Sequence, residues 1–419
     1  MTARAIALLG AVLVASLSTV WGSGPQEIVV AQDGSGDHRT IQAAIESLPA
    51  DGRPATIFIK KGLYQEKLFL TRPYVTLVGE DRAATRIVYP ELRKNWIAAH
   101  GGSDWGAATV NIDTLAHDIT LANLTIYNNY GSLYGDHDHQ FAIRGSSTRI
   151  ILLGCDVIAD GGDTISLWDH ENGMYYHAAC TFEGWVDYIC PRGWCFVRDS
   201  RFFGHNVPSA SFWHDGSKNK SMKFVITDSF IDGVADFPLG RNHRDGQFFF
   251  VRCRFSANMA DRPIYHPSTS PTEWQWGARQ YYWGCERTGG DYAWFADNLA
   301  QADPPVRGEQ IGSRWAFDGR WDPEGTLPSL LPHAIAPSPA NAVRGVPAGA
   351  VTLQWVPARR ARAQRIVLSP GGAEGDEIPG EARRWIAGTL APHTTYTWRV
   401  DALGIADTVR GTTWTFTTE

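Results

Sequence analysis

The chain has 419 residues, a length that suits two domains better than one. Hydrophobic residues make up 43% and charged residues 20%, which is typical of a globular protein with enough apolar material for a core. The formal net charge of −6 argues against nucleic-acid binding, which needs a basic surface. The 17 Trp and 42 Gly favour a β-rich protein whose groove stacks on sugar rings, although Trp is as often found in a core.

The N-terminal stretch MTARAIALLGAVLVASLSTVWGSG has one Arg followed by a run of apolar or small residues. This pattern predicts a secretory signal peptide over residues 1–22, so we expect a secreted or periplasmic protein. No later run is long or apolar enough to predict a membrane span, and we expect a soluble monomer. An exported chain can form disulfides, but six cysteines in 419 residues do not indicate a disulfide scaffold.

The stretch GSGDHRTIQAAIESLP predicts a short amphipathic helix. Ile41, Ala44, Ile45 and Leu48 fall on one helical face, and Pro49 ends the run. We expect this helix to cover the open end of the repeated β structure that follows, whose first rung would otherwise expose an unpaired edge.

Six later segments share one pattern: a few apolar residues, a small residue, then an apolar pair. They are ITLANLTIY, IILLGCDVIA, MYYHAACTFEG, CFVRDSRFFG, FVITDSFIDG and FFFVRCRFSA. The aligned small residues lie 20 to 32 positions apart and are Asn123, Cys155, Cys180, Ser200, Ser229 and Cys253. Short strands repeated at this spacing predict an all-β right-handed parallel β-helix, in which these residues stack as an internal ladder.

The ladder also bears on the cysteines. A buried free cysteine behaves as a small apolar residue. We therefore interpret Cys155, Cys180 and Cys253 as small buried residues rather than disulfide partners. The sequence leaves open whether Cys190 and Cys195 pair with each other.

The composition changes near residue 336, where turn-forming residues separate alternating apolar strands. We expect a β-helix domain over residues 23–326, a Pro-rich linker over 327–340 and a second, β-sandwich domain over 336–419. The segments LAPHTTYTWRVDA and TWTFTT in this second domain resemble a fibronectin type III module.

Two carboxylates within the repeats are candidates for chemistry. Asp163 in ADGGDTISLW and Asp187 in GWVDYIC are 24 residues apart, about one coil of the predicted solenoid. Two close carboxylates resist ionising together, which suits a nucleophile beside a general acid. Arg241 in DFPLGRNHRDG is a cation that could hold Asp187 ionised through a bidentate contact. The alternative for such residues is a structural ion pair or a turn cap.

Three N-terminal motifs resemble those of the pectin methylesterase (pectinesterase) family. They are IVVAQDGSGDHRTIQAAIESLP, IFIKKGLYQEKLFL and VTLVGED, and the resemblance covers roughly residues 27–300. The resemblance implies a parallel β-helix that hydrolyses methyl esters of galacturonate units in pectin or another methyl-esterified polyuronate. It implies no metal and no cofactor.

The resemblance also implies roles for individual residues. Asp187 would attack the ester carbonyl as the nucleophile and form an acyl-enzyme. Asp163 would give a proton to the departing methanol and then activate water. Gln140 in DHDHQFAI would stabilise the oxyanion, and Arg241 would keep Asp187 ionised.

The chain departs from the family pattern around these residues. Gly162 stands where the family has a Gln that donates to the oxyanion, and His243 stands where it has a substrate-stacking Trp. Tyr188 replaces a Phe beside the nucleophile and is a further candidate for substrate binding. Other aromatic and imidazole side chains could fill the gaps: Trp168 or Trp185 for stacking, and His243 or His170 for hydrogen bonding.

Other functions remain alternatives. The segment SLWDH is similar to a short motif of pectate lyases, although the rest of that pattern is absent. Paired carboxylates also serve glycosidases, but no polygalacturonase motif accompanies them. A catalytically weak or inactive pectin-binding β-helix is the non-enzymatic alternative, favoured by the changes at Gly162 and His243.

Overall fold

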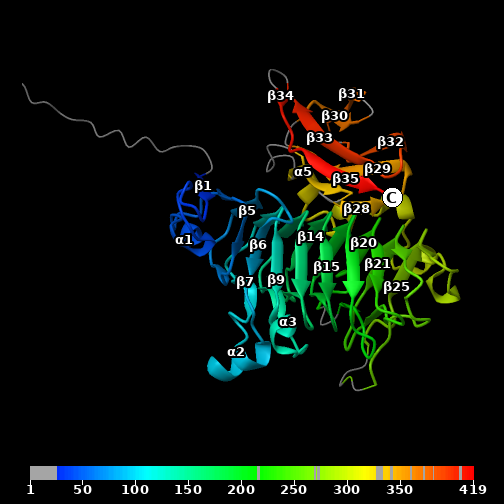
Figure 1. Ribbon diagram of the computed structural model, residues 1–419. Helices are drawn as coiled ribbons and strands as arrows, with labels where there is room; N and C mark the ends of the chain where they lie inside the picture. The colour runs from blue at the N-terminus through cyan, green and yellow to red at the C-terminus, as the bar shows by residue number, and fades with distance from the viewer. Residues whose placement is uncertain are drawn as a thin grey trace, which may run out of the picture.

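The computed structural model in Figure 1 describes residues 26–419 except 215–217, 269, 271–273, 327–333, 340–342, 359–360, 371–372, 381 and 405–407. The predicted signal peptide, residues 1–22, lies outside the described residues.

Most of the described chain is a parallel β-helix built from three sheets (Figure 1). The ten-stranded sheet contains β1 (Gln26–Val30), β2 (Ala55–Ile59), β5 (Val75–Gly79), β8 (Ile119–Ala122), β11 (Ile150–Leu153), β14 (Met174–Ala178), β17 (Trp194–Arg198), β20 (Phe224–Thr227), β23 (Phe248–Val251) and β25 (Gln280–Trp283). The nine-stranded sheet contains β3 (Gly62–Tyr64), β6 (Thr85–Val88), β9 (Thr125–Asn128), β12 (Asp156–Ala159), β15 (Thr181–Gly184), β18 (Arg201–Gly204), β21 (Phe230–Gly233), β24 (Arg254–Phe255) and β26 (Glu286–Arg287). The seven-stranded sheet contains β4 (Leu68–Leu70), β7 (Ala108–Ile112), β10 (Phe141–Gly145), β13 (Ile165–Leu167), β16 (Ile189–Pro191), β19 (Phe212–Trp213) and β22 (Gly240–Arg241).

Each complete coil contributes one strand to each sheet, and each strand pairs in parallel with the equivalent strand of the next coil. The prediction of an all-β parallel β-helix is therefore confirmed. Each of the six repeated segments forms two strands joined by a bend from the ten-stranded into the nine-stranded sheet.

The register corrects one member of the predicted ladder. Ala122 pairs with Leu153, so Asn123 aligns with Gly154 and Leu124 aligns with Cys155. Asn123 has a φ of 55° and Gly154 a φ of 58°, so this position is a left-handed bend rather than an inward-facing site. The alignment was one residue out because Asn is both small and tolerant of the left-handed conformation, like the Gly that it matches.

The other ladder residues are buried as expected: Cys155, Cys180, Ser200, Ser229 and Cys253. The ladder is held partly by hydrogen bonds along the stack, since the Cys180 amide donates to Ser200 Oγ at 3.2 Å. The Ser200 amide likewise donates to Ser229 Oγ at 3.1 Å. All six cysteines are free thiols, Cys190 and Cys195 included.

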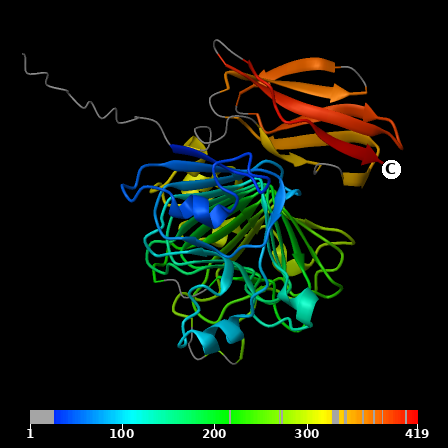
Figure 2. The ribbon, with the colours of Figure 1, turned by 60° about the vertical axis from the view of Figure 1, so that its left-hand side comes forward.

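Helix α1 (Ile41–Glu46) lies over the N-terminal end of the β-helix, with Ile41, Ala44 and Ile45 buried (Figure 2). Glu66 accepts hydrogen bonds from the amides of Ile41 and Gln42 at 3.1 and 3.0 Å, where helical amides lack intrahelical partners. The Gln42 side chain in turn accepts from the Phe69 amide at 2.9 Å. Two of the N-terminal sequence motifs thus interlock to seal this end of the solenoid.

The remaining helices are short and peripheral. They are α2 (Arg93–Ala99), α3 (Tyr130–Tyr134), α4 (Ser313–Ala316), α5 (Pro323–Thr326) and the 3₁₀ turns η1 (Ala293–Phe295), η2 (Leu299–Gln301) and η3 (Gly308–Gln310). Across the described residues, none of the helices has the length and apolar character needed to cross a membrane.

The C-terminal residues form two further sheets with their own core (Figure 2). One contains β27 (Ile335–Ser338), β29 (Gly349–Val356) and β32 (Arg384–Leu390), and the other contains β28 (Val343–Val346), β35 (Trp414–Thr418), β33 (Thr395–Leu403), β30 (Ala363–Ser369) and β31 (Ala373–Pro379), with β34 (Thr408–Val409) beside β33. Strand β27 begins inside the predicted linker, 327–340, so residues 335–338 belong to a sheet.

A cleft of about 1520 Å³ separates these sheets from the β-helix. Its lining includes Arg82, Arg198 and Trp355 but neither Asp163 nor Asp187. Glu324 of α5 lies at the same boundary, where it accepts hydrogen bonds from Tyr176 and Arg198 of the β-helix at 2.9 and 2.7 Å.

Candidate active site

Two carboxylates stand on neighbouring rungs of the seven-stranded sheet. Ile165 of β13 pairs with Ile189 of β16, and Asp163 and Asp187 each lie two residues before these partners. Adjacent strands of a sheet are about 4.8 Å apart, so the two residues are stacked neighbours. Their φ angles are 59° and 50°, a left-handed conformation that is uncommon for residues other than glycine and often occurs at functional sites.

The backbone holds both residues in place. The Asp163 amide donates to the Val186 carbonyl at 2.9 Å, and the Asp187 amide donates to the Ala210 carbonyl at 2.9 Å. Each residue is nearly buried, with Asp163 9% and Asp187 7% exposed. The predicted pairing of the two acids in space therefore agrees with their observed positions.

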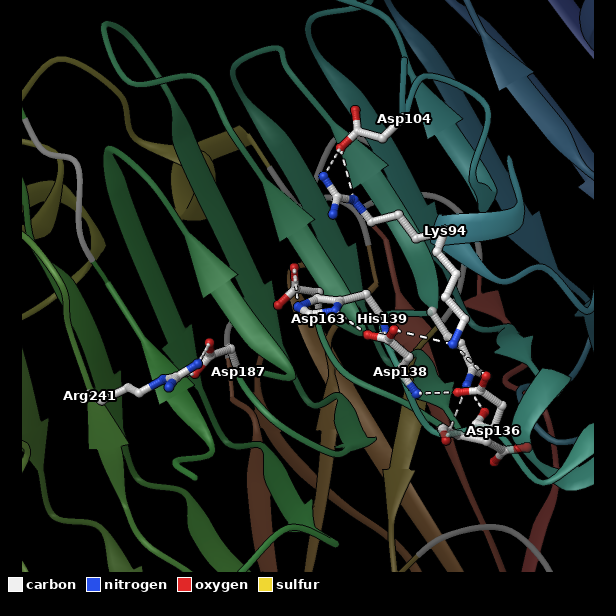
Figure 3. Close-up of polar contacts among 11 residues, drawn as sticks. Lys94, Asp104, Asp136, Asp138, His139, Asp163, Asp187 and Arg241 are labelled. Atoms are coloured by element: carbon white, nitrogen blue, oxygen red, sulfur yellow. Dashed lines mark hydrogen bonds and ion pairs between the residues drawn. The ribbon is translucent and has the colours of Figure 1, made fainter. Parts of the chain in front are cut away.

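Asp187 forms a bidentate ion pair with Arg241 of β22. Arg241 Nε donates to Oδ1 at 3.0 Å and its terminal NH2 donates to Oδ2 at 2.7 Å (Figure 3). Burial works against the charge of Arg241, but the hydrogen bonds and attraction from Asp187 raise its pKa. Such charge-assisted, doubly bonded pairs favour the ionised form of both groups.

Asp163 is in a different electrostatic environment. Burial raises its pKa, and the nearby positive charges of His139, Arg192 and Arg93 only partly offset this effect. Loss of hydration penalises the charged form of an acid, so Asp163 holds its proton to a higher pH than an exposed Asp. The two stacked acids are thus differentiated, with one ion-paired to Arg241 and the other favoured in its protonated form.

His139 is a site residue that the sequence interpretation missed. Its Nε2 lies 3.9 Å from Asp163 Oδ2, and its Nδ1 lies 2.7 Å from Asp138 Oδ1. Lys94 Nζ lies 3.5 Å from Asp138 and 2.7 Å from Asp136, which extends the polar chain away from the carboxylates (Figure 3). In Figure 3, Asp163 stands between His139 on one side and the Asp187–Arg241 pair on the other.

Gln140 does not face this site. Its side chain is completely buried, with Nε2 donating to the Asp136 carbonyl at 2.5 Å and Oε1 accepting from the Gly131 amide at 3.0 Å. The predicted oxyanion role therefore disagrees with its position. The cause is a local irregularity in β10, where the amides of both Ala142 and Ile143 donate to the Thr164 carbonyl, at 2.9 and 3.0 Å.

The aromatic side chains predicted to bind substrate lie in different surroundings. Trp168 lies against two guanidinium groups, with Arg144 Cζ 4.4 Å and Arg192 Cζ 3.9 Å from its ring centre. Arg192 also lies 4.1 Å from the ring centre of Trp213. Trp213 Nε1 in turn donates to His243 Nδ1 at 3.3 Å, and Trp213 of β19 is the register partner of Arg241 in β22.

Trp185 is partly buried between two imidazoles, 4.1 Å from His137 and 5.7 Å from His205 between ring centres. His170 is partly buried in the loop after β13. Tyr188 contradicts its prediction as a substrate-binding residue. It is fully buried and packs on Phe212 at 5.9 Å in the core, from the bend between β15 and β16.

Among the residues that the structure describes, no group of three or more His, Cys, Asp and Glu side chains is arranged to hold a metal ion.

Comparisons with known proteins bear on the segment that carries the two acids. Residues 27–211 match the family model for pectinesterase. This part of the chain is similar to the pectinesterase family. The match includes Asp163 and Asp187 but ends before Arg241, which reaches Asp187 from a later coil.

The putative pectinesterase 11 of Arabidopsis thaliana is 30% identical over 168 residues, which are 39% of this chain and 42% of that protein. The chain thus spans less than half the length of this curated relative. Pectin methylesterase PemA from Erwinia chrysanthemi aligns with a TM-score of 0.56 at 19% identity, covering 71% of this chain and 98% of that chain. A pectin methylesterase in complex with a hexasaccharide aligns with a TM-score of 0.57 at 21% identity, covering 72% and 99%. These likenesses show the β-helical fold.

Proposed function

We propose that this protein hydrolyses methyl esters of galacturonate units in pectin or in another methyl-esterified polyuronate. The observation that carries the proposal is the pairing of Asp187 with Arg241 one rung away from Asp163, whose pKa is raised by burial. One acid is prepared to act as an anion and its neighbour as a proton donor, as acyl transfer requires. The match of residues 27–211 to the pectinesterase family model supports a pectin ester as the substrate.

The proposed reaction has two stages. In the first, an Asp187 oxygen attacks the methyl-ester carbonyl carbon, and the carbonyl π electrons move onto oxygen. The C–O bond to the methoxy group then breaks as Asp163 transfers its proton to that oxygen, which releases methanol and leaves an acyl-enzyme. In the second stage Asp163, now a carboxylate, takes a proton from water, whose oxygen attacks the acyl carbon and frees Asp187.

Arg241 has an electrostatic role in this scheme. Its two hydrogen bonds to Asp187 disperse the negative charge and fix the carboxylate plane. Trp168 and Trp185 remain candidates for contact with sugar rings, as do His170 and His243 for hydrogen bonds. We propose no metal or other cofactor in the reaction.

Product analysis tests the proposal directly. Purified protein incubated with highly methylated pectin is expected to release methanol and to lower the methyl-ester content of the polymer. Unsaturated products that absorb in the ultraviolet would instead indicate a lyase, and new reducing ends would indicate a glycosidase. Binding to the polymer without any of these products would support a non-catalytic pectin-binding protein.

We also infer a secreted or periplasmic monomer in which the sandwich at residues 336–419 is a fibronectin type III-like module. Supporting this, the Ala391 amide donates to the hydroxyl of Tyr396 at 2.8 Å, near the start of β33. A tyrosine that bonds to backbone just upstream at this corner is typical of immunoglobulin-like sandwiches. Mass spectrometry of the exported protein would test the predicted removal of residues 1–22.

A further inference from the structure

Gly162 leaves a gap beside the acid Asp163. A Cβ added at Gly162 would lie 2.7 Å from Val186 Cγ1 and 3.8 Å from Cδ2 of the His139 ring. The imidazole of His139, which comes from the preceding coil, thus borders the space that a side chain at position 162 would enter. A long polar side chain at this position would compete with His139 for the same space.

His139 is oriented for contact with a ligand. Its side chain is 41% exposed, unlike that of Gln140, whose amide is committed to backbone groups. The Nε2 atom faces Asp163 Oδ2 at 3.9 Å, which is too long for a hydrogen bond. An oxygen of a bound ester could therefore accept a hydrogen bond from Nε2 beside the Asp163 carboxyl.

Hydrogen bonding with Asp138 determines which ring nitrogen of His139 carries a hydrogen. Nδ1 lies 2.7 Å from Asp138 Oδ1, and because a carboxylate only accepts, Nδ1 carries the hydrogen. Burial works against the charge of Asp138, but its hydrogen bond with His139 lowers its pKa. With Nδ1 engaged in this way, a second proton on the imidazole resides on Nε2 and turns that atom into a donor.

Other charged groups face His139 from each neighbouring element. The loop before β10 contributes Asp136, Asp138 and His137, and Asp163 comes from the next coil. Helix α2 contributes Lys94, 3.5 Å from Asp138, and Arg93, whose amide donates to the His139 carbonyl at 3.0 Å. Arg144 and Arg192 lie close enough to Asp163 to lower its pKa.

We propose that His139 is a catalytic residue that donates an Nε2–H hydrogen bond to the oxyanion formed when Asp187 attacks the ester. This role replaces the donor side chain that is absent at Gly162, and it rests on the proposed function. As the carbonyl π electrons move onto oxygen, the Nε2–H group stabilises the new negative charge. It neither gains nor loses a proton in this step, and Asp163 remains the proton donor to methanol.

Steady-state kinetics of methanol release from methylated pectin test this role. Loss of one oxyanion donor lowers kcat by about 10²- to 10³-fold, so H139A is expected to lose this much with little change in KM. H139Q restores a neutral donor and is expected to recover at least about a tenth of the wild-type kcat. H117Q is the matched control, because His117 forms a similar pair with Asp118 at 2.5 Å in the bend between β7 and β8. It is expected to retain wild-type kinetics.

Rescue by an amide separates catalysis from a structural role, because Gln keeps a hydrogen-bond donor at position 139 and Ala does not. Circular dichroism should be the same for the wild type, H139A and H139Q. Full activity of H139A, or equal losses of kcat in H139A and H139Q, would overturn the role of His139 while leaving the esterase function intact. A wild-type protein that releases no methanol would overturn both.

Discussion

Asp187 and Arg241 are 54 residues apart in the chain, yet two hydrogen bonds of 3.0 and 2.7 Å join them. The β-helix makes this contact possible because β16, β19 and β22 are successive strands of one sheet. The carboxylate and the guanidinium form a doubly hydrogen-bonded pair, and each side chain is mostly buried, with Asp187 9% and Arg241 21% exposed. The pair therefore both keeps Asp187 ionised and contributes to the stability of the fold.

D187N should fold like the wild type and lose methanol release by at least about 10³-fold, because an amide is not a nucleophile at this carbonyl. D228N provides a matched control. Asp228 has the same left-handed backbone, with φ 51°, and pairs with Arg252 through bonds of 2.6 and 2.7 Å. Circular dichroism should be unchanged in both variants, and only D187N should be inactive. An active D187N would remove the nucleophile from the proposed mechanism.

R241K and R241M distinguish charge from geometry. Lysine keeps the positive charge but cannot form the bidentate contact, so R241K should retain more activity than R241M. R241M leaves the nearly buried Asp187 without its cation, which should lower the free energy of unfolding by about 2–3 kcal/mol. Urea unfolding and methanol release measured on both variants check this order. Equal activity in the two variants would show that the positive charge alone contributes nothing, and wild-type activity in R241K would show that the fork geometry is immaterial.

The repeat pattern was sufficient to predict the fold because each coil repeats the same two-strand unit around a bend. Stacking makes equivalent positions share one environment, so short apolar runs at regular spacing determine the class of architecture. The exception at Asn123 shows the limit of this approach. A small residue fits both the bend and the inward ladder, and only the pairing of Ala122 with Leu153 distinguishes the two.

The acids and Arg241 could be located from the sequence because charged residues in apolar runs are costly unless they are paired. The positions of Gln140 and His139 around these charged groups could not be predicted in this way. The amides of Ala142 and Ile143 share one acceptor in the neighbouring strand, and this irregularity depends on strand pairing that the sequence does not reveal. Next to it, Gln140 is buried and His139 is on the exposed side. The only sequence feature that pointed to His139 was its position directly before the expected Gln140. A bulge in a strand leaves no periodic pattern from which it could be predicted.

The reactivity of the six cysteines tests whether they are free thiols and whether they are buried. Without any reducing agent, a thiol-reactive chromophore should titrate six cysteines in the unfolded protein, because none is in a disulfide. In the native protein Cys285 should react first, since it alone among the six is not fully buried. Hydrogen bonding with Cys253 also lowers the Cys285 pKa, whereas burial raises the pKa values of Cys190 and Cys195. Fewer than six reactive groups after unfolding would contradict the free-thiol assignment.

Asp163 should destabilise the folded protein at neutral pH. Because burial raises its pKa, the folded state binds a proton more tightly than the unfolded state does. The stabilisation that comes from protonated Asp163 is therefore fully present below the ordinary Asp pKa of about 3.9. It is lost as the pH rises through the higher pKa of the folded state. D163N cannot ionise, so the difference in melting temperature between D163N and the wild type should grow as the pH rises between these two pKa values. At higher pH, D163N should remain the more stable protein. The same variant should lose methanol release, since an amide cannot protonate the leaving group.

Thermal unfolding of wild type and D163N at a series of pH values measures this difference, and comparing the two proteins cancels the titration of their other carboxylates. S166A is a suitable control, because Ser166 is a buried, non-ionising residue on β13 whose substitution adds no pH-dependent term. Its stability relative to the wild type should be constant with pH. A D163N protein that is no more stable than the wild type at neutral pH would mean that Asp163 is well solvated, and the acid role proposed for it would lose its physical basis.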